Sequence, residues 1–274
     1  MNSPYVSRLT FHTLRFTFHV SRFTFYVSLL LSLTACHTST TASGAQMAEA
    51  NRLYEEGEFA AAAGRYQTLV DTGVEDGRLY YNLGNAYFKA GDLGRAILNY
   101  RRAQRLLPRD GDVATNLDLA RAQTLDRIEV DGEGAIVGLV RRALGWFTLD
   151  EAAFVALALW IVLVGLVIGA IFWRSRWRVL LTLAGAVAVL LFVGVLLIGA
   201  RLLDERGQPP VVVVAPEVAV RSGPGDDYLT EFTLHAGAEL RLVERREGWA
   251  RVALPGDLQG WAKSEAITEL SSRD

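Results

Sequence analysis

Two long apolar runs place the strongest constraint on how this chain can fold. Residues 152–173 and 179–200 contain no charged side chain, and only residues 174–178 separate them. A helix of about 20 apolar residues crosses the hydrocarbon core of a bilayer. The alternative, two neighbouring core helices of this length in a soluble protein, is rare. The sequence therefore predicts a two-helix transmembrane hairpin.

The charges around the hairpin predict its orientation. Arg174, Arg176 and Arg178 lie in the turn between the runs. Cytoplasmic loops are the ones that retain arginine and lysine, so we expect the turn inside and both flanking regions outside a cytoplasmic membrane. Residues 37–151 and 201–274 each carry a net charge of −4. That balance argues against nucleic acid as a partner and leaves membrane lipid and other proteins.

The start of the chain has the pattern of an export signal. The only cysteine, Cys36, excludes an intramolecular disulfide and follows a short apolar run over residues 29–35. Leu33-Thr-Ala-Cys36 resembles the lipobox of bacterial lipoproteins. We therefore expect residues 1–36 to be a lipoprotein-type signal peptide, with Cys36 as the lipidation site. A signal peptide cleaved elsewhere, or an uncleaved anchor, are the alternatives.

An internal repeat dominates the region before the hairpin. Residues 43–126 repeat with a period of 34, shown by the pairs Gly57/Gly91, Asn51/Asn85 and Tyr66/Tyr100. The second unit fills all eight positions of the tetratricopeptide signature: Tyr80, Leu83, Gly84, Tyr87, Ala96, Tyr100, Ala103 and Pro108. Residues 45–128 are therefore predicted to form an α-solenoid of about two tetratricopeptide (TPR) repeats, closed by a capping helix over about residues 112–128.

Function in such a solenoid usually lies on the concave face, formed by the first helix of each unit. Asparagine amides there can donate to and accept from the backbone of an extended peptide. The alternative is that these asparagines bond within the domain. The candidate peptide-binding residues are Asn51, Tyr54, Tyr81, Asn82, Asn85, Phe88 and Lys89.

Between the repeats and the membrane, residues 136–149 are predicted to form a juxtamembrane helix. Arg141, Arg142, Trp146 and Phe147 are the mixture expected at a membrane interface. Neither apolar run contains an ionisable residue, so the usual marks of a transporter or proton path are missing. The hairpin is interpreted as an anchor.

The C-terminal region changes to short alternating strands, predicted at 211–214, 217–221, 239–244, 249–254 and 260–263. Val218-Ala-Val-Arg-Ser-Gly-Pro224, followed by Gly248-Trp249 and Gly260-Trp261, resembles the bacterial SH3 domain. We expect a small all-β SH3-like barrel over residues 208–270. Tyr228, Trp249 and Trp261 either line an aromatic ligand groove or belong to the core.

Enzymatic chemistry lacks its usual residues. Beyond the signal region only His37 and His235 remain, without a nucleophile–base pair, metal-ligand spacing or a phosphate-binding loop. No catalytic residue, metal or cofactor is therefore expected. The chain is predicted to be a multidomain, non-enzymatic interaction protein.

The succession of parts resembles the E-type members of the Bacteroides aerotolerance (Bat) group. The similar segments are residues 80–89, 91–97 and 219–224. The resemblance implies a scaffold that works beside von Willebrand A-type membrane proteins and a MoxR-type ATPase in envelope stress tolerance or protein maturation. Its partners would be membrane or envelope proteins, bound through extended segments. The alternative is a cell-wall tether whose SH3-like domain binds peptidoglycan while the helical domain recruits an envelope enzyme.

Overall fold

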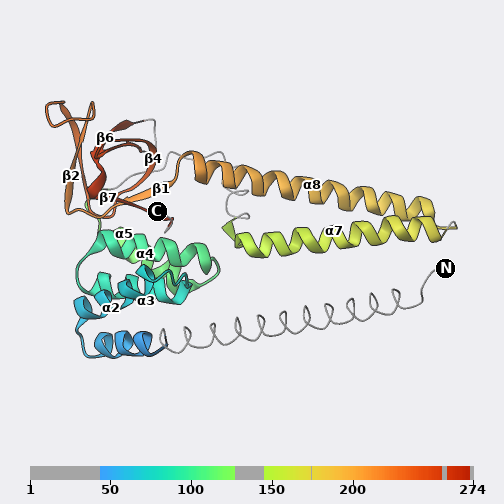
Figure 1. Ribbon diagram of the computed structural model, residues 1–274, viewed down its shortest axis with the longest axis horizontal. Helices are drawn as coiled ribbons and strands as arrows, with labels where there is room; N and C mark the ends of the chain where they lie inside the picture. The colour runs from blue at the N-terminus through green and yellow to red at the C-terminus, as the bar shows by residue number, and fades with distance from the viewer. Residues whose placement is uncertain (1–43, 127–144, 174, 255–257, 272–274) are drawn as a thin grey trace, which may run out of the picture.

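The structure, a computed structural model, describes residues 44–126, 145–173, 175–254 and 258–271. It consists of a helical domain, a pair of long apolar helices and an antiparallel β-domain (Figure 1). This confirms the predicted multidomain fold. The signal peptide, Cys36 and residues 136–144 of the predicted juxtamembrane helix lie outside the described residues.

The helical domain contains five short helices in the described part of the chain. They are a first helix over residues 44–55, then α2 (Phe59–Asp71), α3 (Gly77–Lys89), α4 (Leu93–Leu106) and α5 (Gly111–Ala122). The side chains of Asp76, Asp92 and Asp110 accept hydrogen bonds from backbone N–H groups in the first turns of α3, α4 and α5. Each such cap typically stabilises a helix by about 1 kcal/mol. Aspartates thus set where three of these helices begin.

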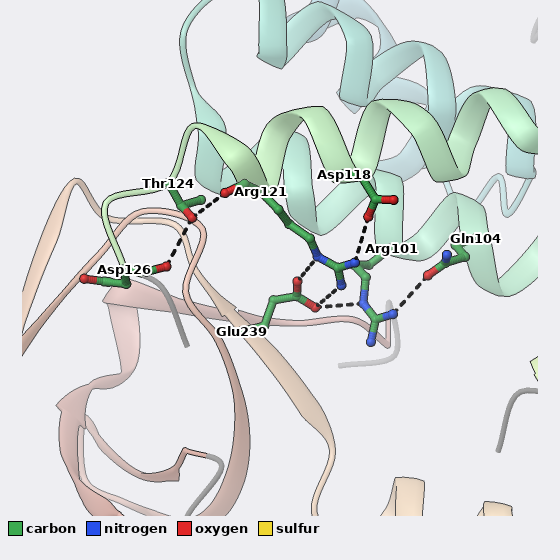
Figure 2. Close-up of polar contacts among 7 residues, drawn as sticks. All are labelled: Arg101, Gln104, Asp118, Arg121, Thr124, Asp126 and Glu239. Carbon is green, nitrogen blue, oxygen red and sulfur yellow. Dashed lines mark hydrogen bonds and ion pairs between the residues drawn. The ribbon is translucent and has the colours of Figure 1, made fainter. Parts of the chain in front are cut away.

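The last helix of this domain is shorter than predicted. α5 ends at Ala122, and the chain then turns through Gln123 to Asp126. The hydroxyl of Thr124 lies 2.8 Å from the carbonyl oxygen of Arg121 and 3.2 Å from that of Asp126 (Figure 2). The turn brings the Asp126 carboxylate to the β-domain, where its Oδ2 accepts a 2.6 Å hydrogen bond from the backbone N–H of His235.

The two apolar helices lie side by side and extend away from the other domains (Figure 1). They are α7 (Leu149–Phe172) and α8 (Trp177–Gly207). Leu149–Phe172 and Trp177–Leu203, of 24 and 27 residues, are long and apolar enough to cross a membrane. A capping box fixes the start of α7: the Thr148 hydroxyl accepts from the Glu151 backbone, and the Glu151 carboxylate accepts from the Thr148 backbone.

The β-domain is one sheet of seven antiparallel strands in the order β3-β2-β6-β5-β4-β1-β7. The strands are β1 (Pro210–Val213), β2 (Glu217–Arg221), β3 (Thr230–His235), β4 (Glu239–Arg246), β5 (Trp249–Ala253), β6 (Gln259–Lys263) and β7 (Ile267–Glu269). Two of these, β3 and β7, were not predicted. The core is mainly valine, leucine and alanine, including the fully buried Val220, Ala250 and Val252.

The helical domain and the β-domain share a core. Ile97 and Leu117 of α4 and α5 belong to one buried cluster with Val212 of β1 and Leu270. The contact is close at Gly94, where an added Cβ would lie 2.6 Å from the carbonyl oxygen of Val213. In the sequence the two modules precede and follow the predicted hairpin. In the structure they pack directly against each other.

Candidate functional site

A polar hollow of about 190 Å³ opens on the face formed by the first helix and α3. Its lining residues are Asn51, Tyr54, Glu55, Tyr66, Asn82 and Asn85. Four of the seven residues predicted for the concave face therefore meet in one place. Glu55 and Tyr66 were not predicted, although the pairing of Tyr66 with Tyr100 in the repeat already indicated a shared structural position.

The oxygen atoms of two asparagines are held by buried tyrosines. The Tyr66 hydroxyl donates to Oδ1 of Asn51 at 2.6 Å, and 34 residues later the Tyr100 hydroxyl donates to Oδ1 of Asn85 at 2.8 Å. Burial raises the pKa of Tyr66 to about 12 and also raises the pKa of Tyr100. Both hydroxyls therefore stay protonated at neutral pH and act as donors.

Each tyrosine takes one acceptor site on an asparagine oxygen, and the amide nitrogens of these asparagines remain open as donors to a ligand. Nδ2 of Asn51 and Nδ2 of Asn85 donate to no other residue in the described part of the chain. Oδ1 of Asn85 also accepts from Nδ2 of Asn116 at 2.9 Å, which fixes that amide further. The predicted alternative, asparagines that bond within the domain, thus applies to their oxygens.

Asn82 differs from both neighbours. It is half-buried and lines the hollow, yet neither its amide oxygen nor its amide nitrogen bonds to another described residue. Its amide atoms are not among the buried, unsatisfied atoms of the described residues, so both groups are open to water or to a ligand. The hollow therefore offers a ligand two oriented amide donors, from Asn51 and Asn85, and both the donor and the acceptor of the Asn82 amide.

The other three predicted concave-face residues lie outside this hollow. Tyr81 accepts a 3.0 Å hydrogen bond from Nδ2 of Asn116, and Phe88 packs against the cluster around Ile97. Lys89 is exposed in the last turn of α3. The structure uses Tyr81 and Phe88 partly for internal packing.

The three aromatic residues of the β-domain differ in exposure. Trp261 is 7% exposed, and the guanidinium of Arg246 lies 5.4 Å from its ring centre. Trp249 is half-buried, with Nζ of Lys263 5.8 Å from its ring centre. Tyr228 is 47% exposed. Of the three rings, only Tyr228 presents a large surface to a ligand.

The Tyr228 loop is held in place by Arg221. Nη1 of Arg221 donates to the carbonyl oxygens of Asp226 at 2.6 Å and Tyr228 at 2.9 Å. The Tyr228 ring also covers Gly223, where an added Cβ would lie 2.3 Å from the ring. The exposed ring is therefore presented on a fixed loop.

A cluster of charges joins the two domains, as Figure 2 shows. Glu239 at the start of β4 accepts from Nε of Arg121 at 2.6 Å and from Nη2 at 3.1 Å. Nε of Arg101 lies 3.0 Å from Oε2 of the same carboxylate. A further link comes from Arg102, which donates to the carbonyl oxygens of Glu269 and Leu270. Charge pattern alone gave no signal for this cluster, because each arginine lies more than 100 positions from its partner in the β-domain.

The part of the chain that the structure describes contains no candidate metal site. No group of three or more histidine, cysteine, aspartate and glutamate side chains there is arranged to hold an ion.

Comparison with known proteins agrees with the two soluble domains. Residues 47–111 match the family model for the tetratricopeptide repeat, and residues 214–269 match the model for the bacterial SH3 domain. No curated protein matches the chain. The chain thus combines a tetratricopeptide repeat, a bacterial SH3 domain and two helices apolar enough to span a membrane. The two matched domains point to protein–protein interaction.

Proposed function

We propose that this protein is a non-enzymatic scaffold anchored in the cytoplasmic membrane, whose TPR domain holds an extended segment of a partner protein. The observation that carries the proposal is the amide of Asn82, which lines the polar hollow and bonds to no other residue that the structure describes. An extended peptide backbone offers both a donor and an acceptor at each residue. Asn82 can pair with both, while the nitrogens of Asn51 and Asn85 donate to carbonyl oxygens.

Recognition of this kind depends weakly on the partner's sequence. Backbone hydrogen bonds supply binding without selecting side chains, so selectivity comes from the hollow's rim. The acidic side chain there is Glu55, which favours a partner segment with a basic residue. Tyr54 adds an aromatic surface for an apolar side chain.

The membrane context narrows the class of partner. With the arginine-rich turn in the cytoplasm, both soluble domains face outward and meet the extracytoplasmic parts of envelope proteins. The resemblance to the Bat group supports von Willebrand A-type membrane proteins as partners, together with a role beside a MoxR-type ATPase in stress tolerance or maturation.

Photo-crosslinking in native membranes tests the proposal. A benzoylphenylalanine at position 54 in the full-length chain is expected to capture an envelope protein, identified by mass spectrometry. Asn82→Ala should abolish that crosslink. The control Gln67→Ala should not, because Gln67 bonds to Asp71 on α2, outside the hollow. A crosslink that survives Asn82→Ala unchanged would overturn the proposal.

A cell-wall tether is the second candidate function, and the exposed, fixed ring of Tyr228 favours it. An exposed aromatic ring on a small β-domain suits the flat faces of sugars or short peptides. Attachment of muropeptides to a photo-crosslinker at position 228, with no protein captured at position 54, would favour the tether over the scaffold.

A further inference from the structure

The helical domain touches the hairpin directly at the start of α7. Arg109, in the turn between α4 and α5, forms an ion pair with Glu151 in the first turn of α7. Nη1 of Arg109 also lies 3.3 Å from the carbonyl oxygen of Trp146. Glu151 is itself fixed by the capping box with Thr148. The α4–α5 turn is therefore held against the first turn of α7.

The position of Glu151 along α7 sets its depth in a bilayer. At about 1.5 Å per residue, the 24 residues of α7 extend about 36 Å, more than the ~30 Å hydrocarbon core. The charged first turn must then lie in the headgroup layer. The exposed aromatics Trp146 and Phe147 come just before it, as is typical of a membrane interface. Since Arg109 bonds to Glu151, the α4–α5 turn lies at the same depth.

An exposed leucine lies at this level. Leu106, the last residue of α4, is 39% exposed, and it precedes Arg109 by three residues. An apolar side chain beside an arginine suits the boundary between headgroups and acyl chains, where the leucine is buried and the charge stays hydrated.

We propose that Leu106, Arg109, Trp146 and Phe147 form a lipid-contacting surface, so that the TPR domain rests on the phospholipid headgroups of the membrane that holds the hairpin. This membrane-resting surface is continuous with α7, which argues for lipid as its occupant. It is not selective for anionic lipid, because Glu151 balances the charge of Arg109. The inference rests on the proposed membrane anchoring.

Spin labels can measure the depth of this surface. Leu106→Cys, Leu125→Cys and Ile161→Cys are made separately in the full-length chain, in a Cys36→Ser background, and placed in phosphatidylcholine nanodiscs. Leu125 is a matched control because it is 76% exposed and equally apolar but follows α5, next to the β-domain. Ile161 is exposed in the middle of α7 and reports on the bilayer core.

The ratio of oxygen to nickel-chelate collision rates is expected to be highest at position 161 and lowest at position 125. At position 106 it is expected to be several-fold higher than at position 125. If the ratio at 106 equals that at 125 while 161 reports lipid, the membrane-resting surface is wrong and the anchoring stands. If 161 also behaves as aqueous, the proposed anchoring itself fails, and the surface with it.

A second variant tests the role of the ion pair. Arg109→Gln should move the label at position 106 toward the aqueous ratio, because the turn is no longer held to Glu151. Arg95→Gln, which removes an exposed pair with Asp92 at the start of α4, should leave the ratio unchanged. Equal ratios in the two variants would show that Arg109 does not position the turn.

Discussion

The carboxylate of Glu239 accepts two hydrogen bonds from the guanidinium of Arg121, and so connects β4 to α5 across the domain boundary. Both oxygen atoms of the carboxylate accept a hydrogen bond, with donor–acceptor distances of 2.6 and 3.1 Å. This bidentate geometry is specific to arginine and restricts rotation of the two side chains relative to each other. With Arg101 on the same carboxylate, one acidic side chain holds two helices of the solenoid.

Glu239→Ala is expected to lower the free energy of unfolding by about 1–3 kcal/mol, because the Arg121 guanidinium loses its hydrogen-bond acceptor and the Arg101 guanidinium loses its ion-pair partner. Denaturant unfolding of the detergent-solubilised full-length chain measures the change. Glu244→Ala on the same strand removes an exposed pair with Arg246 and should cost less than about 0.5 kcal/mol. Equal losses in the two variants would contradict a joining role for Glu239.

Gly94→Ala should separate the domains by steric conflict. The added methyl group would lie 2.6 Å from the Val213 carbonyl oxygen, a backbone atom that cannot rotate away. We expect a loss of about 1–3 kcal/mol in unfolding free energy. Faster proteolysis near residues 208–210 should accompany it.

Gly64→Ala is the matched control, since nothing lies within 4 Å of an added Cβ in the middle of α2. There the substitution should stabilise the helix by up to about 1 kcal/mol. If Gly94→Ala were also stabilising, β1 and α4 would not be in contact in solution.

Local features of this fold could be predicted from the sequence. Gly57 and Gly91, 34 residues apart, both adopt the left-handed conformation, with φ of 83° and 84°. Gly84 must be small because an added Cβ would lie 2.6 Å from the ring of Tyr100. These positions are fixed within one repeat, by turns and by neighbouring helices, so a pattern of residues is enough to identify them.

Strands β3 and β7 were missed for different reasons. β3 does alternate, with Phe232 and Leu234 packed on the core between Glu231, Thr233 and His235, so its sequence carried a signal that the prediction did not use. β7 has only three residues and is recognisable through its pairing with β1. It therefore depends on its tertiary partner.

The hollow was predicted only in part for a related reason. The asparagines were recognised from their place on the concave face, but which of their atoms remain open depends on Tyr66 and Tyr100. The interdomain contact of Glu239 depends on partners more than 100 residues away. Neither relationship has a local signal in the chain.

Alkaline pH should weaken the helical domain through Tyr66. Its pKa is raised by burial to about 12 in the folded state, whereas an unfolded tyrosine ionises near about 10. The folded state therefore binds the proton more tightly. The contribution of Tyr66 protonation to the free energy of unfolding is complete below about pH 10 and is lost as the pH rises to about 12.

Tyr66→Phe should reduce the pH dependence over that window. The variant also loses the hydrogen bond to Asn51, so its unfolding free energy at pH 8 should fall by about 1 kcal/mol. Denaturant unfolding of the full-length chain at pH 8, 10, 11 and 12 measures both effects. Identical slopes for the two proteins between pH 10 and 12 would show that Tyr66 is not the group responsible.

The orientation of the hairpin can be tested at Ser175, which lies exposed in the turn between α7 and α8. The arginines around it predict a cytoplasmic position, because translocation of positively charged loops is disfavoured. Ser175→Cys should therefore stay unreactive toward a membrane-impermeant maleimide in cells with a permeabilised outer layer, and react after lysis. Ser222→Cys, exposed in the β2–β3 loop, should react before lysis. The reverse pattern would place both soluble domains in the cytoplasm, out of reach of the cell wall. In that case the tether would be excluded, and the hollow around Asn82 would have to bind a cytoplasmic segment.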